Sequence, residues 1–145
     1  MLENKKLAIL GAGKIGETLV KGLLDAGAIA ARDVVVTAAH EERTRVLAER
    51  YGVAAGASNA EAASRADVVL LAVKPKMVET VAREIAEVVR PEQLVVSVAA
   101  SVRTAAIEAA SGGRAPVVRA MPNTPCSLKQ GITAICAGSA ARAEH

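Results

Sequence analysis

The sequence predicts an α/β fold, a doubly wound and mainly parallel sheet with helices on both faces. Short runs rich in Val, Ile and Leu alternate along the chain with longer Ala- and Leu-rich segments of helical periodicity. The segments between successive strands are long enough for right-handed parallel crossovers. At 145 residues, of which 52% are hydrophobic, residues 1–145 have the size of one domain with one core.

The N-terminal part of the chain contains a strand–helix–strand unit. Residues 6–10 (KLAIL) and residues 33–37 (DVVVT) are typical of short buried strands. Between them, residues 14–26 place their apolar side chains on one helical face, and Gly27 provides a stop signal. This unit predicts two parallel strands joined by a crossover helix.

The middle of the chain continues the alternation. A charged helix is expected over residues 41–51 and a shorter one over residues 59–65. Residues 68–73 (VVLLAV) have no polar position, which is typical of a central parallel strand covered on both faces. The remaining expected elements are helices over 76–89 and 104–110 and strands over 94–98, 116–120 and 131–137.

Composition excludes several classes of partner. The cationic side chains are scattered, the net charge is only +3 and Tyr51 is the single aromatic residue, so a nucleic-acid surface is not expected. No apolar run approaches the roughly 18 residues of a membrane helix, and no secretory signal is visible. Cys126 and Cys136 match no metal-ligand spacing, and free thiols are favoured over a disulfide. We therefore expect a cytoplasmic protein without metal or membrane partner.

The strongest chemical signal is GAGKIG, directly after the first predicted strand and at the start of the first helix. In a Rossmann-type domain Gly11 permits the tight turn, Gly13 lets the backbone approach a pyrophosphate, and Gly16 lets helix and strand pack closely. The free N–H groups of the helix then face the phosphates. The alternative is a purely structural glycine turn.

The end of the second strand bears on the choice of cofactor. NAD-preferring sites place an acid there for the ribose 2′-OH, whereas this chain has Thr37-Ala38-Ala39-His40. A small neutral strand end followed by His40, Arg43 and Arg45 favours the 2′-phosphate of NADPH, with NADH as the alternative. The two arginines also fit a solvated helix face.

Three further strand ends carry candidate residues. Lys74 and Pro75 end the apolar strand, at the edge where open sheets bind ligands, although Pro75 also suits a helix start and Lys74 could face water. Small residues at 97–101 (SVAAS) would let a flat ring lie against backbone. Two prolines bound the polar pair Asn123 and Thr124 in MPNTP.

Taken together, GAGKIG, Asn59, AVKP, SVAAS and RAMPNTP resemble the N-terminal domain of pyrroline-5-carboxylate reductases, over essentially the whole chain. The resemblance implies reduction of a small cyclic imine, Δ1-pyrroline-5-carboxylate, to L-proline with NAD(P)H, as the last step of proline biosynthesis. It also implies a homodimer or higher oligomer formed through a helical C-terminal domain that residues 1–145 do not include. This chain by itself is then expected to bind cofactor with little or no activity.

The resemblance also assigns residues. It places 10–15 along the pyrophosphate, Asn59 at the adenosine ribose or its phosphate, and 72–75 and 99–100 around the nicotinamide half. The family's serine-containing turn is replaced here by Ala38-Ala39-His40, which leaves His40 as its substitute. The expected cofactor-binding residues are Leu10, Gly11, Ala12, Gly13, Lys14, Ile15, Gly16, His40, Arg43, Asn59, Ala72, Val73, Lys74, Pro75, Ala99 and Ala100. Asn123 and Thr124 are expected to shape the nicotinamide and substrate pocket, and no catalytic acid or base is named.

Two alternatives remain open at this stage. The same domain could belong to another oxidoreductase, such as a β-hydroxyacid dehydrogenase or an F420-dependent NADP reductase. It could also be a free-standing NADP-binding module without activity. AVKP together with MPNTP favours the reductase of cyclic imines.

Overall fold

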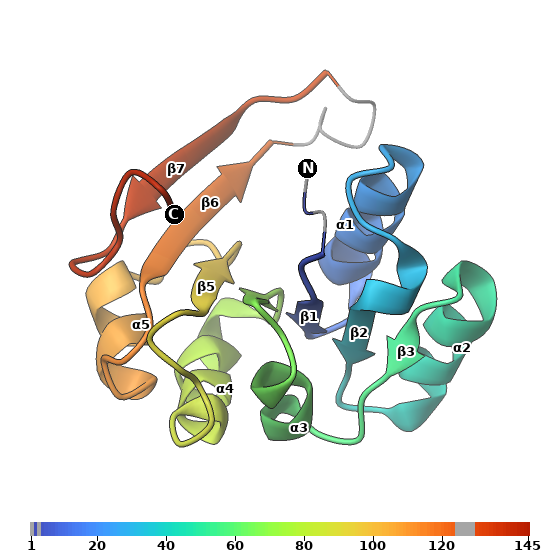
Figure 1. Cartoon of the computed structure of the whole chain (residues 1–145), viewed down its shortest axis with the longest axis horizontal. Helices are drawn as coiled ribbons and strands as arrows, with labels where there is room; N and C mark the ends of the chain where they lie inside the picture. The colour runs from blue at the N-terminus through green and yellow to red at the C-terminus, as the bar shows by residue number, and fades with distance from the viewer. Residues whose placement is uncertain (1, 3, 124–129) are drawn as a thin grey trace.

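The computed structural model describes residues 2, 4–123 and 130–145 (Figure 1). Its strands are β1 (Leu7–Leu10), β2 (Val34–Thr37), β3 (Ala54–Ala55), β4 (Val68–Leu71), β5 (Leu94–Ser97), β6 (Val117–Pro122) and β7 (Thr133–Ala137). Its α-helices are α1 (Lys14–Asp25), α2 (Glu41–Tyr51), α3 (Asn59–Ser64), α4 (Val78–Ile85) and α5 (Thr104–Ala110), with short 3-10 helices η1 (Ala31–Asp33) and η2 (Pro75–Met77).

The strands form one sheet in the order β3-β2-β1-β4-β5-β6-β7. Every neighbouring pair is parallel except β6 and β7, which are antiparallel. The order reverses at β1, so successive crossovers run first toward β3 and then toward β6. The predicted doubly wound α/β fold, with helices on both faces, is confirmed (Figure 1).

Two apolar layers cover the two faces of the central strands. Alternate residues of β1 divide between them: Ala8 and Leu10 pack with α3, α4 and α5, while Leu7 and Ile9 pack with α1 and α2. This division explains why the central strands are apolar at every position. Because the chain has no Phe or Trp, small helix residues such as Ala62, Ala63 and Ala82 form much of the contact with the sheet.

The structure differs from the sequence expectations mainly at element ends. The strand expected over 68–73 ends at Leu71, because the chain turns away before Pro75 begins η2. The helix expected over 76–89 is regular only over Val78–Ile85. The strand β3 was not predicted; it consists of two alanines, and its pairing with β2 defines it. β7 is antiparallel because residues 123–132 are too few for a helical crossover.

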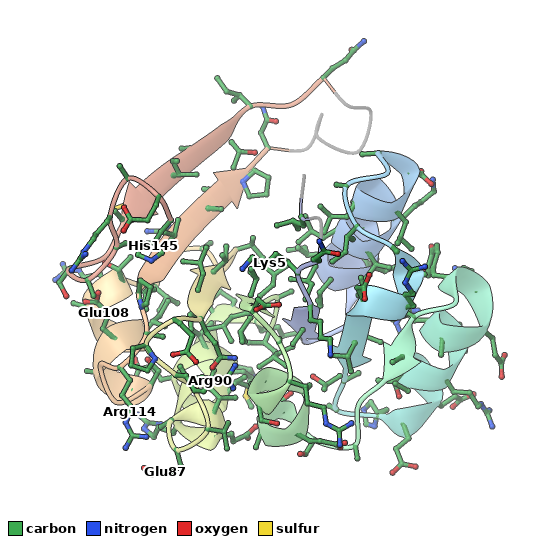
Figure 2. The ribbon with its side chains drawn as sticks, in the orientation of Figure 1. Lys5, Glu87, Arg90, Glu108, Arg114 and His145 are labelled. Atoms are coloured by element: carbon green, nitrogen blue, oxygen red, sulfur yellow. The ribbon has the colours of Figure 1, made fainter. Side chains whose placement is uncertain are left out.

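The last segment of the chain is anchored to both β6 and α5. Gly138 N donates to Val117 O at 2.7 Å, and the Glu108 carboxylate accepts from Ser139 N at 2.6 Å. Figure 2 shows Glu108 on α5, on the side of this segment. A side chain at position 138 would meet Glu108 and the backbone of β6, so glycine is required at this contact. No helix in the described ranges is both long and apolar enough to cross a membrane.

Candidate functional site

The carboxyl ends of four neighbouring strands lie level with one another. Leu10 at the end of β1 pairs with Thr37 of β2 on one side and with Leu71 of β4 on the other, and Leu71 pairs with Ser97 of β5. The loops that leave these strands carry most of the residues predicted from the sequence. Ligands of open parallel sheets bind at this edge, so the fold brings the candidates to the expected place.

Packing of the protein itself requires two of the three motif glycines. Gly11 has a φ of +97°, and a Cβ there would lie 2.9 Å from Val73 N and 2.4 Å from the side chain of Val73. A Cβ on Gly16 would lie 2.5 Å from Gly11 O. The N–H groups of Gly11 and Ala12 both donate to Thr37 O, at 3.1 and 2.7 Å, which holds the turn against β2. These contacts explain the glycines without any ligand.

Gly13 is different, because no packing contact accounts for it. Its φ of −75° suits any residue, it is exposed, and a Cβ built on it meets nothing within 4 Å. It precedes the first residue of α1, and among the described residues no side chain caps the N–H groups of that helix. The space in front of the helix is therefore open, beside the exposed side chains of Lys14 and Ile15. This geometry is the one a pyrophosphate needs.

The end of β2 has the composition predicted from the sequence. Ala38 is half-buried, Ala39 and His40 are exposed, and the first acids, Glu41 and Glu42, lie in the first turn of α2. A hollow of about 760 Å³ opens between Ala38, the side of α2 that carries Glu41, Glu42 and Glu49, and residues 55–57. A space of nucleoside size thus adjoins the strand end where the adenosine ribose is expected.

The two arginines of α2 are placed differently. Arg45 is exposed and pairs only loosely with Glu49, at 3.9 Å between Nε and Oε1. Arg43 points back to the glycine turn, where its Nε donates to Ala12 O at 2.9 Å and its Nη2 bonds to Glu17. The solvated helix face therefore describes Arg45 but not Arg43.

Glu17, in the first turn of α1, was not singled out from the sequence. It accepts hydrogen bonds from Arg43, from Arg50 Nη1 at 2.7 Å and from the Tyr51 hydroxyl at 3.0 Å. The hydrogen bond from Arg43 is the main cause that holds the pKa of the Glu17 carboxyl below its ordinary value. An acid in the first turn of a helix is usually explained by its favourable interaction with the helix dipole, so nothing in the sequence pointed to these partners for Glu17. The spacing of Arg43 and Arg50, on one face of α2, was the available signal.

The lowered pKa of Glu17 predicts a pH-dependent contribution to stability. The unfolded chain protonates this group near the ordinary value of 4.5, the folded chain only below it, so the contribution is complete above that value and is lost as the pH falls through the folded pKa. We expect Glu17→Gln to lower the free energy of unfolding by about 0.5–1 kcal/mol at pH 7, and by less at pH 3. Urea denaturation of both proteins across this range measures it. The exposed Glu49→Gln is the control, and a wild-type advantage that persists at pH 3 would contradict the assignment.

Asn59 links two elements at the same edge. Its Oδ1 accepts from Thr37 Oγ1 at 2.5 Å, and its Nδ2 donates to Glu84 Oε2 of α4 at 2.6 Å. The half-buried amide is thus held beside the end of β2, one strand away from the glycine turn. Neither Thr37 nor Glu84 was predicted as a partner, since their proximity depends on how α3 and α4 pack.

The ends of β4 and β5 supply small and exposed groups. Ala72 and Ala99 are buried, Val73 is half-buried, and Lys74 and Ala100 are exposed. Pro75 is the first residue of η2, so the helix start that was the alternative to a cofactor role is present. The Ser97 hydroxyl is buried and accepts from Ala99 N at 3.3 Å, so it supports the turn from within.

The β6–β7 connection is described only in part. Asn123 is exposed, and its Oδ1 accepts from Ile132 N at 3.0 Å while its own N–H donates to Ile132 O at 3.2 Å. Asn123 therefore joins the two sides of the connection. Thr124 lies outside the described residues.

The fold and this edge define the class of protein, a Rossmann-like α/β domain with a glycine turn at the start of its first helix. The family model described as "NADP oxidoreductase coenzyme F420-dependent" matches residues 6–101, about two thirds of the chain. The chain belongs to this family.

Similarity to particular proteins is narrower. The chain is 39% identical to a pyrroline-5-carboxylate reductase of Pseudomonas aeruginosa, over 99% of the chain and 54% of the relative. A solved pyrroline-5-carboxylate reductase of Coxiella burnetii superposes with a TM-score of 0.87 at 32% identity, over 97% of this chain and 52% of that one. The Plasmodium falciparum pyrroline carboxylate reductase, solved with NADP bound, has a TM-score of 0.85 at 25% identity, with coverage of 98% and 51%. The chain spans about half the length of the curated relatives it matches.

Proposed function

We propose that this chain is the NADPH-binding part of a reductase that converts Δ1-pyrroline-5-carboxylate to L-proline. Similarity to enzymes of that name over nearly the whole chain supports the reaction. The observation that carries the binding function is the space at Gly13. The protein does not need a glycine there, whereas a dinucleotide phosphate approaching α1 does.

The chemistry of the strand ends favours NADPH over NADH. No acid stands at the end of β2 to hold a ribose 2′-OH, and the first acids belong to the helix that follows. Arg43 reaches the glycine turn through its bond to Ala12 O and is the cation we assign to the 2′-phosphate, with His40 as the second candidate.

The residues of this chain bind and orient the cofactor. Gly13 and the uncapped start of α1 receive the pyrophosphate, and Asn59 holds the adenosine ribose or its phosphate. The turns at 72–75 and 99–100 line the nicotinamide half, with Asn123 and Thr124 at the substrate side. When bound, the nicotinamide supplies a hydride from C4 to the imine carbon, and the protein contributes orientation and electrostatics.

The activity of the longer protein is part of the same proposal. The relatives are about twice as long as this chain. We propose that a helical domain in their remaining half completes the substrate pocket and forms a homodimer or higher oligomer in the cytoplasm. Oxidation of NADPH by a full-length parent, followed at 340 nm with the cyclic imine as substrate, tests the reaction. Failure of that parent to turn over the imine would contradict it.

The family description favours one second candidate, transfer of hydride between NADP and the deazaflavin F420. It uses the same cofactor half, so the two proposals differ only in the second substrate. A full-length parent that reduces F420 with NADPH but leaves the cyclic imine unchanged would decide for this candidate. A chain that binds NADPH while its parent reduces neither would be the binding module without activity.

We expect Gly13→Ala to weaken NADPH binding about 100-fold while leaving the fold unchanged. The free protein has room for the methyl group, but the group occupies the approach of the pyrophosphate to α1. Titration with NADPH, followed by its own fluorescence in a chain without Trp, measures the dissociation constant, and thermal melting checks the fold.

The matched control for this experiment is Gly22→Ala. Gly22 lies within α1, and a Cβ there also meets nothing within 4 Å. It should stabilise the helix by about 1 kcal/mol and leave NADPH binding unchanged. If Gly13→Ala binds NADPH as tightly as the unsubstituted chain does, the glycine turn has only a structural role.

A further inference from the structure

One carboxylate connects the start of α1 to both ends of α2. Glu17 Oε1 accepts from Arg50 Nη1 and from the Tyr51 hydroxyl, while Oε2 accepts from Arg43. The Glu17 side chain is 19% exposed, so these bonds are partly shielded from water. A helix-dipole role alone would need none of these partners. The three bonds show that Glu17 organises the surface between the two helices.

The bond to Arg43 matters because of where that guanidinium lies. Its Nε and Nη2 are occupied by Ala12 O and by Glu17, and no acceptor in the described ranges is bonded to Nη1. A planar guanidinium held at two nitrogens has a defined plane and a defined remaining donor pair. Arg43 also lies in the first turn of the helix that follows β2, where the adenosine ribose of a bound dinucleotide is expected.

Charge balance explains how an acid can stand so close to a phosphate site. Two guanidinium groups, of Arg43 and Arg50, share one carboxylate, so the cluster keeps a net positive charge. Both carboxylate oxygens face donors, which screens their repulsion of a nearby phosphate. The lowered pKa of Glu17 agrees with this arrangement of donors, since the carboxylate stays ionised and hydrogen-bonded to Arg43 at neutral pH.

We propose that Glu17 is a positioning residue for the 2′-phosphate: it holds the Arg43 guanidinium with Nη1 available and thereby sets the preference of this domain for NADPH over NADH. The inference rests on the proposed NADPH binding and adds a residue that contacts no cofactor itself. Glu17→Gln removes the charge that fixes Nη2 but leaves Arg43 in place. The freed guanidinium then samples several orientations, and the loss falls on the cofactor that carries the 2′-phosphate.

The test measures the dissociation constants of NADPH and NADH by calorimetry. The proteins compared are the unsubstituted chain, Glu17→Gln, Arg43→Gln and the variant with both substitutions. We expect the NADH-to-NADPH ratio of dissociation constants to fall about 10-fold in Glu17→Gln. In the Arg43→Gln background the same change should leave the ratio unmoved, because Glu17 acts through that side chain. The exposed Glu87→Gln, whose carboxylate pairs with Arg114 away from the candidate site, should match the unsubstituted chain.

The other outcomes each decide the matter. If Glu17→Gln loses affinity equally for both cofactors, Glu17 has only a structural role. If the preference of this variant for NADPH rises, Glu17 competes with the phosphate for Arg43. Either result overturns the inference while the proposed function stands. An Arg43→Gln variant with the same NADH-to-NADPH ratio of dissociation constants as the unsubstituted chain also overturns the inference, since another group then binds the 2′-phosphate. If the parent chain binds neither cofactor, the proposed function falls and this inference with it.

Discussion

Gly11→Ala is expected to cost the chain about 3 kcal/mol of folding free energy and to abolish measurable NADPH binding. The new Cβ would lie within 3 Å of the Val73 backbone nitrogen and closer still to its side chain, and the φ of +97° is unfavourable for any L-residue. Left-handed strain costs about 1–2 kcal/mol and overpacking another 1–3 kcal/mol. Urea denaturation and NADPH titration measure the two effects.

This result differs from the one expected for Gly13→Ala, because the two glycines serve different purposes. Gly11 is needed for the turn to pack against Val73, just after β4, so its replacement must affect stability as well as binding. Gly13 has no such contact, so its replacement should affect binding alone. A Gly11→Ala protein as stable as the unsubstituted chain would show that the turn can move away from Val73, which would contradict this packing role of Gly11.

Gln93→Leu should destabilise the chain by about 3 kcal/mol or more. Gln93 is fully buried before β5; its Nε2 donates to Ala63 O at 2.7 Å and Ala66 O at 2.5 Å, and its Oε1 accepts from Arg90 N at 2.6 Å. Leucine fills a similar volume but leaves Ala66 O and Arg90 N without this partner, whereas Ala63 O keeps its bond from Ala66 N. Each buried group left unsatisfied costs about 1–3 kcal/mol. The midpoint of urea denaturation measures the loss.

The same substitution offers a clean separation of stability from binding. Gln93 lies at the amino end of β5, away from the carboxyl ends that carry the candidate site, so the folded variant should bind NADPH as the parent does. The chain's other glutamine, Gln130, is exposed, and Gln130→Leu should change stability by less than about 0.5 kcal/mol. Equal stability of the two variants would contradict the role of Gln93 as a buried link.

Much of the site could be predicted because its signals are local. The glycine turn, the acid-free end of β2 and the small residues after β5 are each read within a few positions. Parallel strand order then places their loops at one edge. Local patterns failed where pairing alone defines an element, as in β3, or where a short connection forces a strand to return antiparallel, as in β7.

The roles of charged side chains could not be read in this way. Arg43 and Arg45 are two positions apart, and nothing in the sequence distinguishes their roles. In the structure Arg43 bonds to the glycine turn, whereas Arg45 is exposed to solvent. The difference arises from the rotation of α2 about its axis, which packing against α1 sets. Glu17 and the Asn59–Glu84 bond were missed for the same reason, since their partners lie on other elements.

By itself the sequence determined the alternation of strands and helices, the glycine turn and the neutral end of the second strand, because backbone conformation and apolar periodicity depend on near neighbours. Only the tertiary structure separated the glycines that packing requires, Gly11 and Gly16, from Gly13, which leaves open space. It alone joined Glu17 to Arg43 across two helices. The physical reason is that the space around a Cβ and the partner of a long charged side chain are set by elements distant in the chain, and these come together only on folding.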